Sequence, residues 1–200
     1  QILPQKREYE RTSTTVINSY VGPPVSRYLS ALMQKLKVSN VTSRLTVMQS
    51  SGGVLDVESC LQKPAHIVEC GPAAGVVGAE YIAKRSGFDN VITLDMGGTT
   101  AKASIIEGGT YSLADEYEVG GGMSSSSALV GKGGYALKLP VIDIAEVGAG
   151  GGSIAWLDGA GSLKIGPESA GALPGPACYG LGGERPTVTD ANLILGYLKK

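Results

Sequence analysis

The sequence predicts an α/β or α+β fold, because segments with helical and with β-strand patterns alternate along its 200 residues. Apolar residues within 23–37 fall on one helical face, and residues 71–87 also have a helical pattern. Residues 92–106, ITLDMGGTTAKASII, read as two apolar strands around a glycine turn. Interleaved helices and strands are typical of mixed folds rather than of β-sandwiches.

The first half is expected to contain two helices and a short strand. Two prolines, Pro23 and Pro24, suit the first turn of a helix over 23–37. Residues 44–50 are β-rich and run into a Ser-Gly-Gly turn. The helix over 71–87 has Pro72 at its start and Gly87 as a left-handed cap. Its small residues predict close approach to a neighbouring backbone, and these are Ala73, Ala74, Gly75 and Gly78.

The second half is expected to contain two hairpins and a short final helix. Residues 90–106 form the first hairpin, and the glycine- and serine-rich residues 120–134 predict a mobile loop. Residues 140–147 predict a strand that leads into a second glycine run. Residues 153–167 predict another hairpin, and Asp190 is expected to cap the last helix.

Composition excludes some classes of partner and indicates a compartment. Charged residues make up 18% of the chain and the net charge is -1, which disfavours nucleic acid and membrane surfaces as partners. The three cysteines form no CxxC pair, and no segment has the length and apolarity of a transmembrane helix, so we expect a cytoplasmic protein. The chain begins with Gln1 in a polar segment, which indicates a fragment or a processed subunit.

The turn of the first hairpin has the residues of an anion site. Successive amides at Gly97 and Gly98 can converge on a phosphate, and Thr99 and Thr100 add hydroxyl donors. Asp95 would repel a phosphate unless a divalent cation or its water shell lay between them. The same residues also suit a tight hairpin in which Asp and Thr hydrogen-bond only the turn.

Other nucleotide and hydrolase motifs do not fit. A P-loop needs Gly-Lys-Ser/Thr, but Gly131-Lys132 is followed by Gly133. Residues 148–153 approach the dinucleotide fingerprint, yet the run ends in Ser153 and continues as a strand. No G-x-S-x-G elbow or H-E-x-x-H motif occurs.

The order of these motifs resembles the hydantoinase A family of the actin-like ATPase superfamily, which also contains oxoprolinases and acetone-type carboxylases. One block is residues 71–106, GPAAGVVGAEYIAKRSGFDNVITLDMGGTTAKASII. A second block comprises VGAGGGSIAWLD, GPESAGALPGPACYG and PTVTDANLILGYL. With the early segment YERTSTTVINSYVGPPVSRYL, the resemblance covers nearly the whole chain.

The resemblance implies a partial actin-like, ribonuclease H-like ATPase lobe. Residues 1–88 would be a helical connecting region and residues 89–200 the second phosphate-loop lobe, without the family's amino-terminal phosphate-loop domain. The implied second phosphate loop consists of Asp95, Gly97, Gly98, Thr99 and Thr100. The implied glycine turn beside the nucleotide consists of Gly148, Gly150, Gly151, Gly152 and Ser153.

The resemblance implies an ATP-dependent subunit that opens a cyclic amide, a hydantoin or 5-oxoproline, by phosphorylating its carbonyl oxygen. Asp95 would order water on Mg²⁺ or another divalent metal. The expected partners are the cyclic amide, a second hydantoinase-type subunit and further copies of the chain. The isolated fragment is expected to be inactive. Two alternatives stay open: an ATP-dependent acetone-type carboxylase subunit and a non-catalytic, actin-like nucleotide-binding module.

Five further residues have two interpretations each. Asp143, between apolar neighbours, is either a catalytic or metal-binding carboxylate or a buried structural hydrogen-bonding group. Asp190 is either a helix cap or a ligand, and Cys178 is either a small buried thiol or part of a substrate pocket. Lys102 either approaches a phosphate or is an exposed edge charge. His66 is expected at the surface or a strand edge rather than in catalysis.

Overall fold

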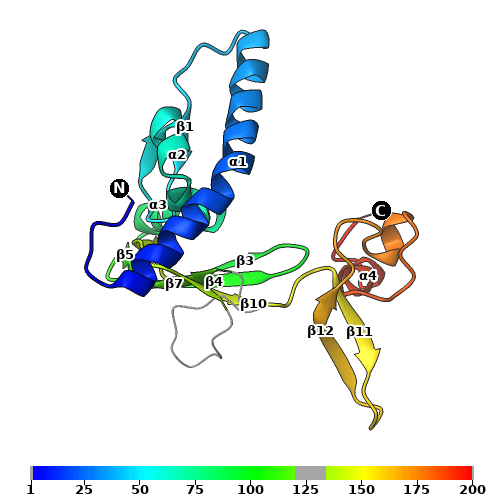
Figure 1. Ribbon diagram of the computed structural model, residues 1–200. Helices are drawn as coiled ribbons and strands as arrows, with labels where there is room; N and C mark the ends of the chain where they lie inside the picture. The colour runs from blue at the N-terminus through cyan, green and yellow to red at the C-terminus, as the bar shows by residue number, and fades with distance from the viewer. Residues whose placement is uncertain (1, 120–133, 200) are drawn as a thin grey trace. The chain divides into compact units, whose positions relative to one another are not determined.

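The computed structural model describes residues 2–119 and 134–199, which contain both helices and antiparallel strands (Figure 1). The predicted mixed fold class is confirmed. The chain divides into two compact units, one formed by Gln1–Thr93 and Ser104–Ala145 and the other by Leu94–Ala103 and Glu146–Lys200. The boundary between residues 88 and 89 stays a prediction about the domains of a longer protein.

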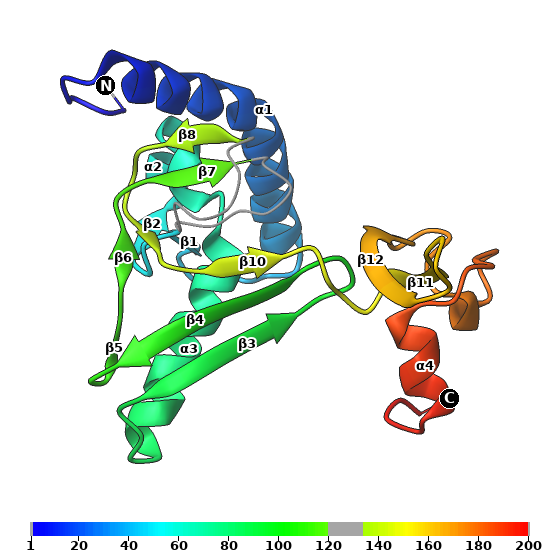
Figure 2. The same cartoon turned by 90° about the horizontal axis from the view of Figure 1, so that it is seen from below.

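The long helix α1 spans Glu8–Val38 and bends partway along its length (Figures 1 and 2). The prediction that it begins at the prolines is wrong, because Pro23 and Pro24 lie inside it. Each proline removes one hydrogen bond and its ring clashes with the carbonyl one turn earlier, which is the usual cause of a bend in a helix that continues past proline. Among the described residues, no helix, α1 included, is both long and apolar enough to cross a membrane.

The predicted strand over 44–50 forms a hairpin in the first unit. Strand β1 (Thr46–Met48) pairs antiparallel with β2 (Val54–Asp56), with Val47 opposite Leu55. Helix α2 (Val57–Gln62) follows at once, because the Asp56 side chain accepts a hydrogen bond from the Ser59 amide and caps it. The 3-10 helix η1 (Pro64–Ile67) then leads towards the next long helix.

Helix α3 spans Cys70–Arg85, and its C-cap Ser86 is followed by Gly87 in the left-handed conformation (φ 78°). The predicted helix and its glycine cap are confirmed. The close approach expected of its small residues holds for Ala73, which is fully buried. It does not hold for Gly75 or Gly78, where an added methyl group would meet no atom of the described residues within 4 Å.

The predicted hairpin over 90–106 forms two neighbouring strands of the main sheet. Strands β3 (Val91–Met96) and β4 (Ala101–Glu107) run antiparallel (Figure 2). The sheet has the order β10-β4-β3, with β5 (Thr110–Tyr111) also pairing with β4. Ile106 points into a core with Ala73 and Val76 of α3, so this helix covers one face of the hairpin's base.

Short strands complete the first unit. β6 (Leu113–Ala114) pairs with β9 (Val141–Ile142), and β7 (Tyr117–Val119) pairs with β8 (Tyr135–Leu137). The single strand predicted over 140–147 is in fact two strands in different sheets: β9 pairs with β6, whereas β10 (Ala145–Val147) lies beside β4 in the main sheet. The predicted loop over 120–134 lies, except for Gly134, outside the described residues.

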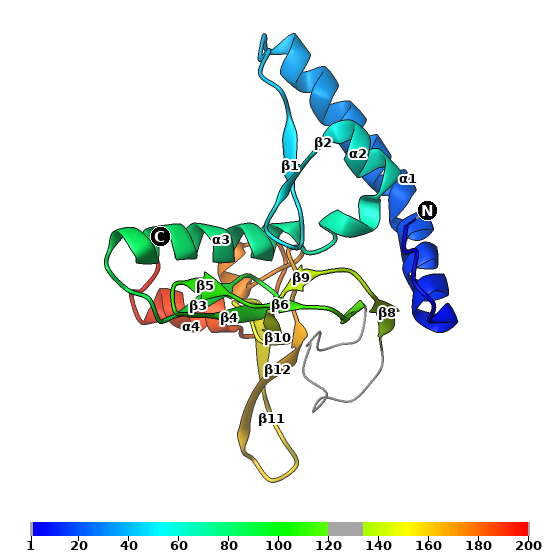
Figure 3. The same cartoon turned by 90° about the vertical axis from the view of Figure 1, so that its left-hand side faces the viewer.

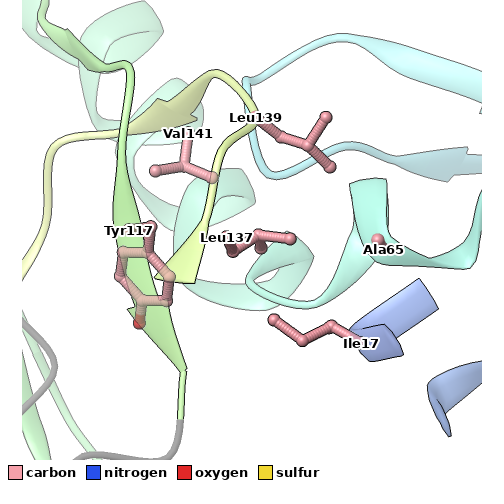
Figure 4. Packing of buried hydrophobic residues seen from close by; sticks show 6 residues of the cluster. All are labelled: Ile17, Ala65, Tyr117, Leu137, Leu139 and Val141. Atoms are coloured by element: carbon pink, nitrogen blue, oxygen red, sulfur yellow. The ribbon is translucent and has the colours of Figure 1, made fainter. Parts of the chain in front are cut away.

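A buried cluster ties α1 to these strands (Figure 4). Ile17 comes from α1, Ala65 from η1, and Leu137 from β8, and each is at most 7% exposed. Burying such side chains is the main favourable contribution to the stability of this unit.

The second unit contains the predicted hairpin of β11 (Ser153–Leu157) and β12 (Leu163–Ser169), with Ala155 opposite Ile165 (Figure 3). The 3-10 helix η2 (Ala177–Tyr179) and helix α4 (Val188–Ile194) follow. The prediction that Asp190 caps this helix is confirmed, although the N-cap residue itself is Thr187. Asp190, three residues after Thr187, is its partner in a reciprocal capping box.

Candidate functional site

The turn between β3 and β4 is open and lined with free donors. The Gly97 amide donates to the Thr100 carbonyl over 3.0 Å and closes the turn. Within the part of the chain that the structure describes, the amides of Gly98, Thr99 and Thr100 donate to no acceptor. A methyl group on Gly98 would meet nothing within 4 Å, and φ is not positive at either glycine. Neither backbone strain nor packing among described residues therefore explains Gly98, which leaves room for a ligand.

The second predicted glycine segment lies against this turn, backbone to backbone. The Gly151 amide donates to the Gly97 carbonyl over 2.9 Å, and the Gly152 amide donates to the Gly98 carbonyl over 2.6 Å. A methyl group on Gly150 would lie 2.6 Å from the Gly98 carbonyl carbon, so glycine there is required for close approach. The structure therefore brings together the two segments that the sequence indicated separately.

Ser153 closes the glycine turn from inside. Its fully buried hydroxyl accepts a 2.8 Å hydrogen bond from the Gly150 amide, and its own amide donates to the Gly150 carbonyl over 3.0 Å. Ser153 thus shapes the turn and its hydroxyl is already engaged. Among the predicted residues of this turn, Gly148 is the one where a methyl group would meet no described atom within 4 Å.

The first turn of α4 holds the glycine turn from the other side. The Thr189 amide and hydroxyl both donate to the Gly151 carbonyl, over 2.7 and 2.8 Å. The sequence analysis gave Thr189 no role. The capping-box spacing of Thr187 and Asp190 was the available signal, because it fixes Thr189 in the first helical turn.

Asp190 is a structural acceptor in this unit. Its carboxylate accepts hydrogen bonds from the amide of Cys178 over 2.7 Å and from the amide and hydroxyl of Thr187, each over 2.8 Å. Burial acts to raise the pKa of Asp190, but the hydrogen bonds from Cys178 and Thr187 outweigh it and lower the pKa to about 2. These contacts favour the cap interpretation.

The two predicted catalytic carboxylates belong to different units. Asp95, near the end of β3, is exposed, and its side chain has no hydrogen bond or ion pair with the described residues. Asp143 lies between β9 and β10, where its amide donates to Ser112 and its carbonyl accepts from the Ser104 hydroxyl. Asp143 is exposed, so the prediction that it is buried is wrong. The chain passes from one sheet to another there, and this side chain is exposed to solvent.

Three other candidates also differ from expectation. Lys102 is neither a free phosphate contact nor an exposed edge charge: its Nζ lies 3.5 Å from Glu146 Oε1, and both side chains are mostly buried. Cys178 is exposed, so the prediction of a buried thiol is wrong, and its hydrogen bond to Asp190 raises the pKa of the thiol. His66 is half-buried in η1 rather than at a strand edge, and burial lowers its pKa.

The donor set fits a phosphate-bound magnesium ion better than an independent metal site. No group of three or more His, Cys, Asp or Glu side chains gathers among the described residues. Mg²⁺ usually takes one or two carboxylates and completes its shell with phosphate oxygens and water. Asp95, beside a turn of free amides, would hold the water shell of such an ion.

A cavity of about 490 Å³ lies beyond the glycine turn, within the same unit. Its wall includes Ser169, Ala170 and Arg185, and the Ala170 amide donates to the Gly152 carbonyl over 2.8 Å. Arg185 forms a two-pronged ion pair with Glu168, with hydrogen bonds of 2.6 and 2.7 Å. An open cavity therefore adjoins the glycine turn.

Comparison with known proteins identifies the family. The model of the hydantoinase/oxoprolinase family matches residues 11–200. The chain belongs to this family. Its mixed helices and strands are those of the family's actin-like ATPase-type domains.

This hydantoinase/oxoprolinase-family chain is similar in sequence to parts of several longer proteins. An uncharacterized protein of Methanocaldococcus jannaschii is 50% identical over 99% of this chain and 29% of its own length. The caprolactamase subunit alpha of Pseudomonas jessenii is 42% identical over 99% of the chain and 27% of its own length. The acetophenone carboxylase gamma subunit of Aromatoleum aromaticum is 35% identical over 96% of the chain and 24% of its own length. The chain thus spans less than a third of the length of these relatives.

Two solved structures have the same fold. A nucleotide-free structure of acetone carboxylase, from work on ATP-dependent acetone carboxylation, matches 99% of this chain and 26% of its own, with a TM-score of 0.79 and 29% identity. The crystal structure of the ATP-dependent caprolactamase from Pseudomonas jessenii matches 100% of this chain and 27% of its own, with a TM-score of 0.67 and 38% identity.

Proposed function

We propose that this chain supplies part of the ATP site of a subunit that opens a cyclic amide, a hydantoin or 5-oxoproline, through phosphorylation of the carbonyl oxygen. The observation that carries the proposal is the pair of glycine turns, joined backbone to backbone and presenting the free amides of Gly98 and Thr99 beside Asp95. The family relationship supports it, because relatives include an ATP-dependent caprolactamase and 5-oxoprolinases.

Each residue of the site has a distinct role in this proposal. The amides of Gly98 and Thr99 and the hydroxyls of Thr99 and Thr100 hold phosphate oxygens where negative charge develops. Asp95 accepts hydrogen bonds from the water of a phosphate-bound Mg²⁺ and orients it. Bound Mg-ATP would supply the phosphoryl group and the metal's positive charge.

Phosphorylation makes a poor electrophile reactive. The lactam oxygen takes the terminal phosphoryl group and ADP leaves, which activates the ring carbon towards water. Attack by water breaks the ring C–N bond, the nitrogen takes a proton, and an acyl phosphate is left. A second water converts the acyl phosphate to carboxylate and phosphate. Asp143 stays a candidate for handling these protons. The 490 Å³ cavity beside the glycine turn is a suitable size for the small ring.

A ketone carboxylase subunit is the second candidate. The higher TM-score of the acetone carboxylase structure, 0.79 against 0.67, favours it, whereas the higher identity of the caprolactamase subunit favours the amidohydrolase. We also propose a second subunit as partner, because these relatives are named as subunits. Assembly with further copies of the chain is part of the same proposal. The free thiols of Cys60, Cys70 and Cys178 suit the cytoplasm, where we propose the protein acts.

Phosphate release by the full-length protein, expressed with its partner subunit, tests the reaction class. With Mg-ATP we expect release that depends on added hydantoin or 5-oxoproline, together with the ring-opened product. Release that requires ketone and bicarbonate instead would identify the carboxylase. ATP binding without release under either condition would identify a non-catalytic module. The 200-residue chain alone is the comparison, and we expect almost no release from it because it spans under a third of its relatives.

A further inference from the structure

We propose that Thr189 is a positioning residue that aims the free amides of the β3–β4 turn at the nucleotide phosphate. This inference rests on the proposed ATP site. The amide and the hydroxyl of Thr189 both donate to Gly151 rather than to the β3–β4 turn. Thr189 acts through the glycine turn, by hydrogen bonds within the second unit.

The first step runs through the peptide unit between Gly151 and Gly152. Thr189 donates twice to the Gly151 carbonyl, over 2.7 Å from its amide and 2.8 Å from its hydroxyl. A trans peptide is planar, so fixing the direction of a carbonyl also fixes the N–H of the next residue, which points the opposite way. That N–H belongs to Gly152 and donates to the Gly98 carbonyl over 2.6 Å.

The second step repeats this geometry in the turn itself. The Gly98 carbonyl shares a peptide plane with the N–H of Thr99, which therefore points away from the glycine turn. In the same way, the Gly97 carbonyl accepts from Gly151 over 2.9 Å and sets the direction of the Gly98 N–H. The two amides that are free among the described residues are thus oriented by the glycine turn.

Thr189 is itself held in place. The capping box fixes the first turn of α4, since Thr187 and Asp190 hydrogen-bond each other's backbone on either side of Thr189. Space for its hydroxyl exists only because residue 151 is glycine, where an added methyl group would lie 2.7 Å from Thr189 Oγ1. Because the Thr189 amide already donates to the Gly151 carbonyl, the role of Thr189 is to hold that carbonyl in place.

Thr189→Val tests the inference in the full-length protein. Valine keeps the shape of the side chain and the hydrogen bond from the backbone amide to Gly151, but it removes the hydroxyl donor. We expect the KM for Mg-ATP to rise about three- to tenfold, as for loss of one hydrogen bond, with little change in the KM for the cyclic amide. Amide exchange at residues 97–100 and 151–152 of the ligand-free protein should quicken. Thr189→Ser, which keeps the hydroxyl, should restore both the KM for Mg-ATP and the amide-exchange rates to those of wild type. Thr110→Val, at an exposed threonine of β5, is the matched control.

The outcomes separate this inference from the proposed function. If wild type turns over Mg-ATP but Thr189→Val leaves its KM unchanged, the positioning role is wrong while the ATP site stands. Faster amide exchange with an unchanged KM would make Thr189 purely structural and would also overturn the inference. If wild type neither binds nor hydrolyses Mg-ATP, the proposed function fails and the positioning role fails with it.

Discussion

Gly150→Ala is expected to destabilise the second unit by about 1–3 kcal/mol, the usual cost of forcing extra volume into a packed site. The new methyl group would lie 2.6 Å from the Gly98 carbonyl carbon and 2.7 Å from both the Gly98 oxygen and the Thr99 carbonyl carbon. These are backbone atoms of a closed turn, so no side-chain rotation relieves the clash. Denaturant unfolding of the full-length protein, with amide exchange at residues 97–103 and 146–153, measures the effect.

Gly148→Ala is the matched control for this prediction. Gly148 lies in the same glycine run, its φ is not positive, and an added methyl group would meet no described atom within 4 Å. We expect its unfolding free energy to stay within about 0.5 kcal/mol of wild type. Equal losses of stability in the two variants would contradict the close docking of the two turns.

Asp95→Asn is expected to lower kcat for Mg-ATP-dependent phosphate release at least about 100-fold, the usual scale for losing one aligned electrostatic group. The substitution is nearly isosteric but removes the negative charge that would orient metal-bound water. Asp95 is exposed and has no side-chain partner among the described residues, so stability should barely change. Steady-state kinetics and thermal unfolding of the same preparation measure the two effects.

Asp89→Asn controls for general loss of surface charge, because Asp89 is an exposed carboxylate shortly before β3. We expect the Asp89→Asn variant to have the same kcat as wild type. Near-normal turnover in Asp95→Asn would remove Asp95 from the mechanism and leave the turn with amide donors alone. Loss of turnover together with loss of folding would instead make Asp95 a structural residue.

Local features of the fold were predictable from sequence because they depend on neighbouring residues. The β3–β4 and β11–β12 hairpins and helix α3 each contain their own turn or cap signal, such as Gly87 after α3. The start of α1 was not predictable in this way. Proline favours a first turn, but burial of Ile17 against η1 and β8 extends the helix back to Glu8.

The candidate site was only partly predictable, because its geometry depends on contacts between distant segments. Glycine clustering indicated both turns. It did not indicate that Gly150 would lie against Gly98, or that Thr189 would hold Gly151. Asp143 was misjudged because apolar neighbours in sequence do not determine which way a side chain points where a strand is interrupted.

Hydrogen exchange of the full-length protein with and without Mg-ATP tests the central claim most directly, because it reports on individual backbone segments. The claim predicts that Mg-ATP slows exchange of the amides at residues 98–100, which have no acceptor among the described residues of the free chain. Residues 151–152, which already donate to the turn, should gain further protection. Saturating Mg-ATP that protects other segments and leaves residues 98–100 unchanged would contradict the assignment of this turn as a phosphate site.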